Sequence, residues 1–180
     1  MKETGIVRRI DVLGRVVIPK EIRKTLKMNE GDPVEIYTEK NALVIKKYSP
    51  VKSLGGSLEC ATKSLFKCTG HIVLVCDAAN YISAAGINAK DVVGSKIPKA
   101  IEELLTNKKT LVVNKNDGGV TTEIISGDKT NFLNQLFMPI TYGDEATGGI
   151  ILADRSKDSP ITSSDISLAM LCAEFISAHF

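Results

Sequence analysis

The sequence has no long apolar segment and few cysteines, which argues against a membrane protein, a secreted protein and a disulfide-stabilised domain. No stretch of its 180 residues approaches the roughly 18 consecutive apolar residues of a membrane-spanning helix. Its first five residues, MKETG, lack the apolar core of a signal peptide. The four cysteines are too few and too dispersed for a disulfide framework, and reduced cysteines are commonly small buried hydrophobes. We therefore expect a cytoplasmic protein without a membrane partner.

Histidine is scarce as well, which argues against most hydrolytic enzymes. Only His71 and His179 are present, and neither lies beside the nucleophile signature that a Ser-His-Asp or Cys-His site needs. The chain contains no Cys-x-x-Cys pair and no glycine-rich loop ending in Lys-Ser or Lys-Thr. The pair Gly148-Gly149 stands at the head of a predicted strand, where a tight turn accounts for it. We expect no catalytic residues, no metal site and no cofactor.

Positive charge is present but unevenly distributed. The formal net charge is only +2. Residues 1–27 contain eight Lys or Arg against three acids, whereas residues 51–180 contain twelve against fourteen. A basic end on an acidic body is typical of a protein in which that end meets a polyanion, although a solvated charged face gives the same count.

The basic end reads as short strands around one short helix. Pro19 suits the first turn of a helix, where its missing N–H costs nothing. Alternating apolar residues then predict a hairpin. The expected elements are strands at 5–10 and 16–18, a turn at 11–14, a helix at 20–27 and a hairpin over 34–45.

The remainder, residues 54–180, follows a linker at 49–53 and reads as an α+β domain. Thr162 or Ser163 ahead of Asp165 is typical of a helix start, and Gly70 is a typical helix stop. The polar segment 113–130 is interpreted as a loose loop rather than a mobile lid. The expected elements are helices at 54–69, 100–105 and 162–180 and strands at 71–76, 81–85, 110–113, 120–125, 131–140 and 148–154.

The helix predicted at 20–27 carries charge of a single sign on one side. At 100° per residue its four basic side chains fall within about 100° of one another, while Ile22 and Leu26 lie on the side that enters a core. Clustered cations repel one another, and phosphate relieves that repulsion while releasing counterions. With the flanking arginines, the basic residues of this region are Arg8, Arg9, Arg15, Lys20, Arg23, Lys24 and Lys27.

The small size of the basic end has a second consequence. Roughly 48 residues bury too little apolar surface to offset chain entropy without disulfides or a metal. We therefore expect this half to pair with a second copy of itself. Pairing would double the basic surface and space it symmetrically, as in dimeric DNA-binding proteins.

Three runs of this half carry a resemblance to a known family: TGIVRRID at 4–11, LGRVVIPKEIR at 13–23 and EGD at 30–32. Together they resemble the AbrB-type swapped-hairpin DNA-binding domain. The resemblance implies a small, β-dominated barrel with one short helix, built by two interleaved chains that bind double-stranded DNA. The residues it implies for DNA contact, with their basic neighbours, are Arg8, Arg9, Arg15, Lys20, Arg23 and Lys24.

Two positions depart from the family pattern. Val12 stands where a polar turn residue is more typical, and we expect this difference to be peripheral. Lys24 takes a place where arginine is common. Lysine lacks the guanidinium fork that reads a base edge with two hydrogen bonds, so Lys24 is expected to discriminate bases less well.

The second half, residues 54–180, is similar to a GAF domain in the order and length of its elements. The two halves together resemble a family of regulators of spore development. That resemblance implies activation and repression of late sporulation genes in the forespore nucleoid, and tetramers assembled through both halves. The helices at 54–69 and 162–180 would then pack against a partner chain as well as on their own sheet. The sequence identifies no ligand and leaves a small-molecule effector open.

Two other functions were weighed. The swapped-hairpin fold also occurs in antitoxins, but these usually end in a disordered tail, whereas residues 54–180 have the apolar patterns of a folded domain. Some GAF-fold proteins are thiol reductases. Cys60 and Cys68 lie eight residues apart on one predicted helix, about 12 Å between Cα atoms, which is too far for a disulfide. We expect a DNA-binding regulator and not an enzyme.

Overall fold

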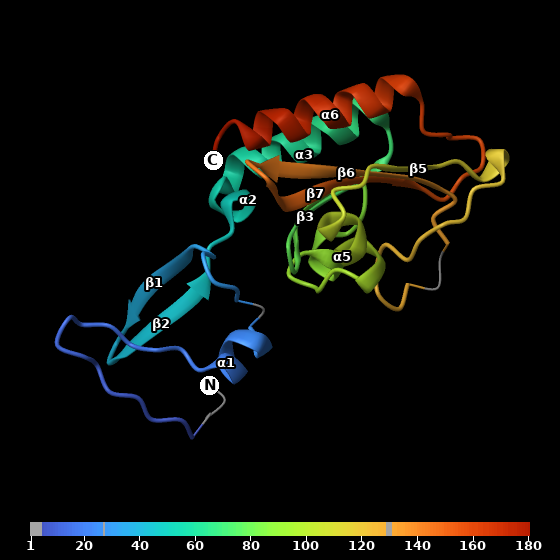
Figure 1. Cartoon of the computed structure of the whole chain (residues 1–180). Coiled ribbons are helices and arrows are strands. Elements are labelled where there is room, and N and C mark those ends of the chain that lie inside the picture. The colour runs from blue at the N-terminus through green and yellow to red at the C-terminus, as the bar shows by residue number, and fades with distance from the viewer. Residues whose placement is uncertain (1–4, 27, 129–130) are drawn as a thin grey trace. The chain divides into compact units, whose positions relative to one another are not determined.

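The computed structural model describes residues 5–26, 28–128 and 131–180 (Figure 1). The chain divides into two compact units, Met1–Tyr48 (unit 1) and Ser49–Phe180 (unit 2). In the described ranges, no helix combines the length and the apolar character needed to span a membrane.

Unit 1 contains a short helix and a two-stranded hairpin. Helix α1 spans Lys20–Thr25, and strands β1 and β2 span Val34–Glu39 and Ala42–Lys47. The strands pair antiparallel with Ile36 opposite Ile45, as the alternation of apolar residues predicts. Helix α1 ends at Thr25 rather than at the expected residue 27, which lies outside the described residues.

The strands expected at 5–10 and 16–18 are absent from the described part of unit 1. A strand exists only where a neighbouring backbone completes its ladder. Among the described residues no ladder hydrogen bond joins segment 5–10 to segment 16–18; the turn between them has one backbone hydrogen bond of that kind, from the N–H of Asp11 to the carbonyl of Arg15, 3.1 Å long. Neither segment therefore has a strand partner in the described part of the chain.

Unit 1 has almost no core of its own. Of its described residues only Pro19 and Met28 are buried. Leu26, expected to enter a core, is 50% exposed. The large apolar side chains exposed on this unit are those of Ile6, Val7, Ile10, Val12, Leu13, Val16, Val17, Leu26, Val34, Ile36, Tyr37, Leu43 and Tyr48.

Unit 2 is built on one antiparallel sheet of five strands in the order β4-β3-β7-β6-β5. Its strands are β3 (Ile72–Asp77), β4 (Tyr81–Ala85), β5 (Leu111–Val113), β6 (Asn134–Tyr142) and β7 (Glu145–Asp154). Its helices are α2 (Pro50–Ser53), α3 (Gly55–Thr69), α4 (Ala89–Val92), α5 (Lys99–Thr106) and α6 (Ser163–Ser177), with a 3-10 turn η1 at Lys115–Asp117.

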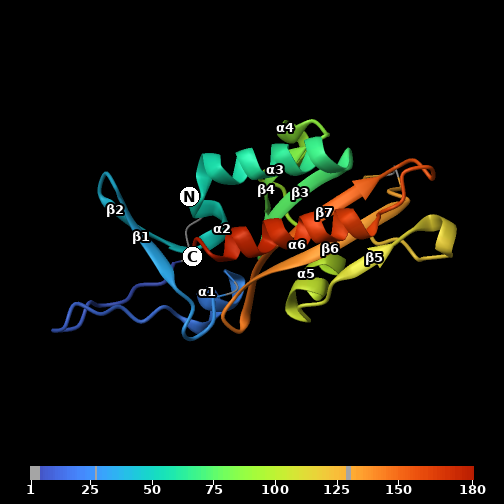
Figure 2. The same ribbon diagram turned by 90° about the horizontal axis from the view of Figure 1, so that it is seen from above.

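Helices cover both faces of this sheet. Helices α3 and α6 lie next to each other over one face (Figure 1), and Figure 2 shows the same pair from above. In β3, Val73 and Val75 belong to the core under these helices, whereas Leu74 and Cys76 belong to the core on the side of α5. A strand buried on both faces reads as a continuous apolar run, which explains the run at 71–76 and confirms the α+β architecture.

The start of α6 and the end of α3 follow the sequence signals, although α6 ends at Ser177 rather than at the expected residue 180. Thr162 and Asp165 form a capping box at the start of α6, with the Asp165 carboxylate accepting from the Thr162 N–H at 2.8 Å. Gly70 ends α3 in the left-handed conformation with φ of 75°, which costs glycine little because it has no Cβ.

The segments 120–125 and 49–53 differ from expectation. Residues 120–125 were expected as a strand, but side chains satisfy their backbone instead: the Tyr81 hydroxyl donates to the Ile124 carbonyl, and the Gln135 amide bonds both polar backbone groups of Thr122. Within the segment 49–53, expected as a linker, residues 50–53 form α2, and Val51 is fully buried in the core of unit 2.

Candidate nucleic-acid interface

The first group of predicted contact residues lies on α1. The Pro19 carbonyl accepts the Arg23 N–H at 3.0 Å, so proline occupies the start of the helix as the sequence predicts. Lys20 and Lys24 are exposed, and Arg23 is half-buried. These three cations come from a single two-turn segment.

The second group lies on the extended segment that precedes α1. Arg8 and Arg9 are both exposed. In the described ranges, no carboxylate pairs with either of them, nor with Lys20, Arg23 or Lys24. Five of the six predicted contact residues are therefore cations without a carboxylate partner in the described part of their own chain.

Arg15 is the exception. Its Nε donates to Oδ2 of Asp11 over 2.7 Å. The Arg15 side chain is nevertheless 72% exposed, so the ion pair occupies one edge of the guanidinium and leaves the rest in solvent. The pairing of Asp11 with Arg15 was not predicted from the sequence. The signal for it is the four-residue spacing of these two opposite charges across a turn that contains Gly14.

Asp11 also shapes the turn that carries Arg15. Its Oδ1 accepts the backbone N–H groups of Leu13 and Arg15 at 2.9 and 2.8 Å. Gly14 completes the turn with φ of 76° and donates its N–H to the Asp11 carbonyl at 3.0 Å. The hydrogen bonds from Arg15, first its N–H and then its guanidinium, lower the pKa of the Asp11 carboxyl, so this carboxylate stays ionised at neutral pH.

His71 and Cys76 of unit 2 are buried and have structural environments, whereas Cys60 and Cys68 are exposed. His71 is buried, with its Nδ1 and Nε2 each 3.4 Å from a carboxylate oxygen, of Asp154 and Asp165 respectively. It therefore joins the start of β3 to the end of β7 and the start of α6. Burial raises the pKa of the Cys76 thiol to about 12, which keeps it protonated and a poor nucleophile. All four thiols are free.

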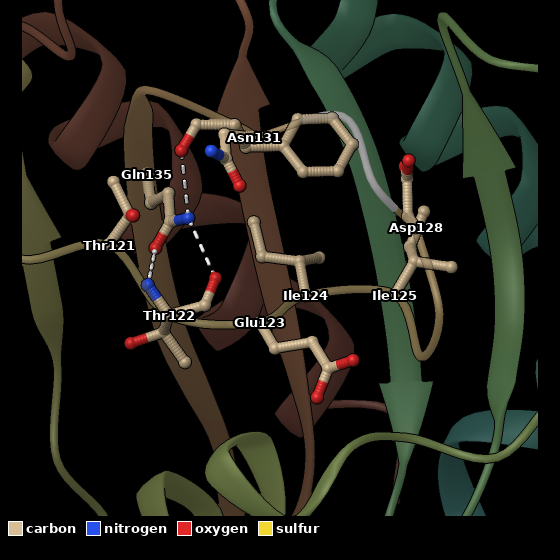
Figure 3. A pocket seen from close by; sticks show the side chains of 9 residues that line it. Thr121, Thr122, Glu123, Ile124, Ile125, Asp128, Asn131 and Gln135 are labelled. Carbon is tan, nitrogen blue, oxygen red and sulfur yellow. Dashed lines mark hydrogen bonds between the residues drawn. The ribbon is translucent and has the colours of Figure 1, made fainter.

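A small cavity lies beside the segment 121–135 (Figure 3). Its volume is about 150 Å³, below the roughly 300 Å³ at which pockets for drug-sized ligands begin. Gln135 lies in its wall and donates to the carbonyls of Thr122 and Phe132, as the dashed lines in Figure 3 trace. Phe132 lines this cavity, Tyr81 and Phe137 are buried in the core, and Tyr142 is 55% exposed.

Two family models match the chain. The family described as stage V sporulation protein T C-terminal, transcription factor, matches residues 59–180. The family described as antidote-toxin recognition MazE, bacterial antitoxin, matches residues 7–53. The first match covers most of unit 2, and the second covers most of unit 1 together with α2.

Curated relatives and solved structures agree with this division. The chain is 34% identical to stage V sporulation protein T of Bacillus subtilis (strain 168) over 158 residues, 87% of each protein. It is 43% identical to the transition state regulatory protein AbrB of the same organism over 82 residues, 46% of this chain and 85% of AbrB. The GAF domain of a phosphoenolpyruvate-protein phosphotransferase from Coxiella burnetii is similar in fold, with a TM-score of 0.57, 11% identity, and coverage of 72% of this chain and 81% of that one.

Unit 2 therefore has a GAF-like fold and unit 1 is AbrB-like. The long match to one relative joins both units in the same order. The chain belongs to the stage V sporulation protein T family of transcription factors.

Proposed function

We propose that this protein is a sequence-specific regulator of sporulation genes that binds double-stranded DNA through Arg8, Arg9, Arg15, Lys20, Arg23 and Lys24. The observation that carries the proposal is the set of six cations on unit 1, all exposed except the half-buried Arg23, and five of them without a carboxylate partner in the described part of the chain. Phosphates supply the missing negative charge, and arginines supply the forks that read guanine.

The apolar surface of unit 1 supports an intertwined homodimer as the DNA-binding form. Val34, Ile36 and Leu43 lie on the same face of the β1–β2 hairpin, each at least 42% exposed. A cluster of exposed apolar side chains on one face is typical of a protein–protein interface. The unpaired extended segments 5–10 and 16–18 offer their backbones to the same partner.

A second contact between copies is proposed through α3 and α6. Met170, Leu171 and Phe175 of α6 are 51%, 67% and 52% exposed, although the other side of the helix is packed on the sheet. Contacts through both units would join two dimers into a homotetramer. In such an assembly several basic surfaces engage DNA at once, and their affinities multiply.

The MazE match does not favour an antitoxin. It ends at residue 53, and the residues that follow fold into a sheet covered on both faces rather than a tail that wraps around a toxin. Co-purification of a small toxin-like partner would be needed to support that function.

The salt dependence of binding tests the proposed interface directly. With about three or four phosphate contacts from each chain of a dimer, log K should fall with log salt with a slope of roughly −5 to −7. Fluorescence anisotropy with a labelled operator between low and high salt measures this slope. A nearly flat dependence would contradict an interface made of exposed cations.

Removing one guanidinium tests the assignment of single residues. Arg23→Ala is expected to weaken operator binding by about 1–3 kcal/mol if its fork reaches a base edge. The matched control is Lys109→Ala, which removes an exposed cation from unit 2 and should leave affinity almost unchanged. Sedimentation should show the same oligomer for both variants; a monomeric Arg23→Ala would mean that Arg23 is a structural residue.

A further inference from the structure

The turn 11–15 divides the two oxygens of one carboxylate between two tasks. Oδ1 of Asp11 accepts the backbone N–H groups of Leu13 and Arg15 and so closes the turn. Among the described residues, Oδ2 accepts only from Nε of Arg15, at 2.7 Å. Oδ1 therefore stabilises the backbone of the turn, and Oδ2 holds the Arg15 side chain.

The geometry of a guanidinium makes this arrangement specific. Arginine has five N–H donors, one on Nε and four on the two terminal nitrogens. Binding through Nε leaves the terminal pair free, and this pair matches O6 and N7 of guanine. Since the Arg15 side chain is 72% exposed, its free end points to solvent while its base is fixed.

We infer that Asp11 is a positioning residue that aims Arg15 at a base edge and weakens its attraction to phosphate, an inference that rests on the DNA-binding function proposed above. Fixing the guanidinium in advance lowers the entropy lost on binding the correct base. The neighbouring carboxylate also offsets part of the charge that would otherwise bind any phosphate. Asp11 therefore lowers the affinity for arbitrary DNA and raises the discrimination between sequences.

Asp11→Asn separates the two tasks. The amide oxygen of asparagine can still accept the N–H groups of Leu13 and Arg15, so the turn is kept. Its NH₂ group cannot accept from Nε of Arg15, so the guanidinium is released. We expect binding to non-specific duplex to strengthen about threefold, and the ratio of specific to non-specific affinity to fall about tenfold, with a steeper salt dependence for the non-specific complex.

Asp128→Asn is the matched control. Asp128 forms an ion pair with Arg155 over 3.2 Å in unit 2, and neither residue lies on α3 or α6. This substitution removes the same negative charge from the chain without touching unit 1. It should leave the affinities for specific and non-specific duplex, and their ratio, unchanged. If both variants had the same effect, Asp11 would act only through the net charge of the chain, and the inference would be overturned.

The Arg15→Ala background shows whether Asp11 acts through Arg15. In that background Asp11→Asn should change the affinity ratio by less than twofold. An undiminished tenfold loss there, or an unchanged ratio in the Asp11→Asn single variant, would overturn the inference while leaving DNA binding intact. A wild-type chain that binds no duplex at all would instead contradict the proposed function.

NMR of the full chain supplies a readout that does not depend on DNA. The Nε–H signal of Arg15 should be protected from solvent exchange in the wild type and lose that protection in Asp11→Asn. The backbone amide signals of Leu13 and Arg15 should keep their positions. If these amide signals move together with the Nε–H signal, Asp11 is a structural residue of the turn and not a positioning residue.

Discussion

Replacing Ile36 with aspartate should lower operator affinity more than about 100-fold. Ile36 is 59% exposed on the hairpin face that it shares with Val34 and Leu43. In the proposed dimer this face is covered by the partner chain. The substitution would bury a carboxylate without a partner, which costs several kcal/mol, and a loss of about 3 kcal/mol already lowers affinity more than 100-fold.

Sedimentation and anisotropy, measured together, test this expectation. The Ile36→Asp variant should lose the contact through unit 1 and its DNA affinity in parallel, while unit 2 keeps its thermal transition. Val120→Asp is the control, because Val120 is 86% exposed in unit 2 and no interface is proposed there. A variant at Ile36 that still binds the operator as tightly as the wild type would contradict the intertwined dimer.

The largest effect on stability is expected from Gly148→Ala. Gly148 lies in the middle of β7, opposite Asp77 on one side and Ile140 on the other. A Cβ added there would lie 2.2 Å from the carbonyl oxygen of Cys76 and 2.9 Å from Cγ2 of Val51. The strand backbone cannot move away without breaking its ladder, so the cost is about 3 kcal/mol, at the upper end for an overpacked core.

Differential scanning calorimetry measures this cost in the full chain. The transition of unit 2 should fall by roughly 10 °C. Gly56→Ala makes the same chemical change on α3, where an added Cβ meets nothing within 4 Å, and should raise stability slightly because alanine favours a helix. Equal transition temperatures for the two variants would show that β7 can shift to accept a methyl group.

Gly148 also illustrates where the sequence misleads. A pair of glycines before an apolar run predicts a turn at Gly148-Gly149. The structure has both residues inside β7, with the Cβ position of Gly149 only 2.6 Å from Cε2 of Phe137. These glycines are required by the residues that approach them from both faces, and nothing local in the chain identifies such neighbours.

Segment 120–125 shows the same limit in another form. Five of its six residues are β-branched, a composition that favours a strand, and Ile124 is buried. The hydrogen bonds that would make it a strand are taken by side chains of Tyr81 and Gln135, which are distant in sequence. Burial follows from local hydrophobicity, whereas strand pairing depends on which backbone lies alongside.

The sequence by itself determined the two-part organisation, the antiparallel α+β domain, the helix starts at Pro19 and Thr162, and the single-sign charge of unit 1. These features depend on periodicity, capping and composition, which act over a few neighbouring residues. Only the tertiary structure decided that unit 1 has almost no core of its own, that Asp11 holds Arg15 by one edge, and that His71 links two carboxylates from β7 and α6. Each of these depends on where side chains meet in space, because contact energies between distant residues, and not local preferences, select those arrangements.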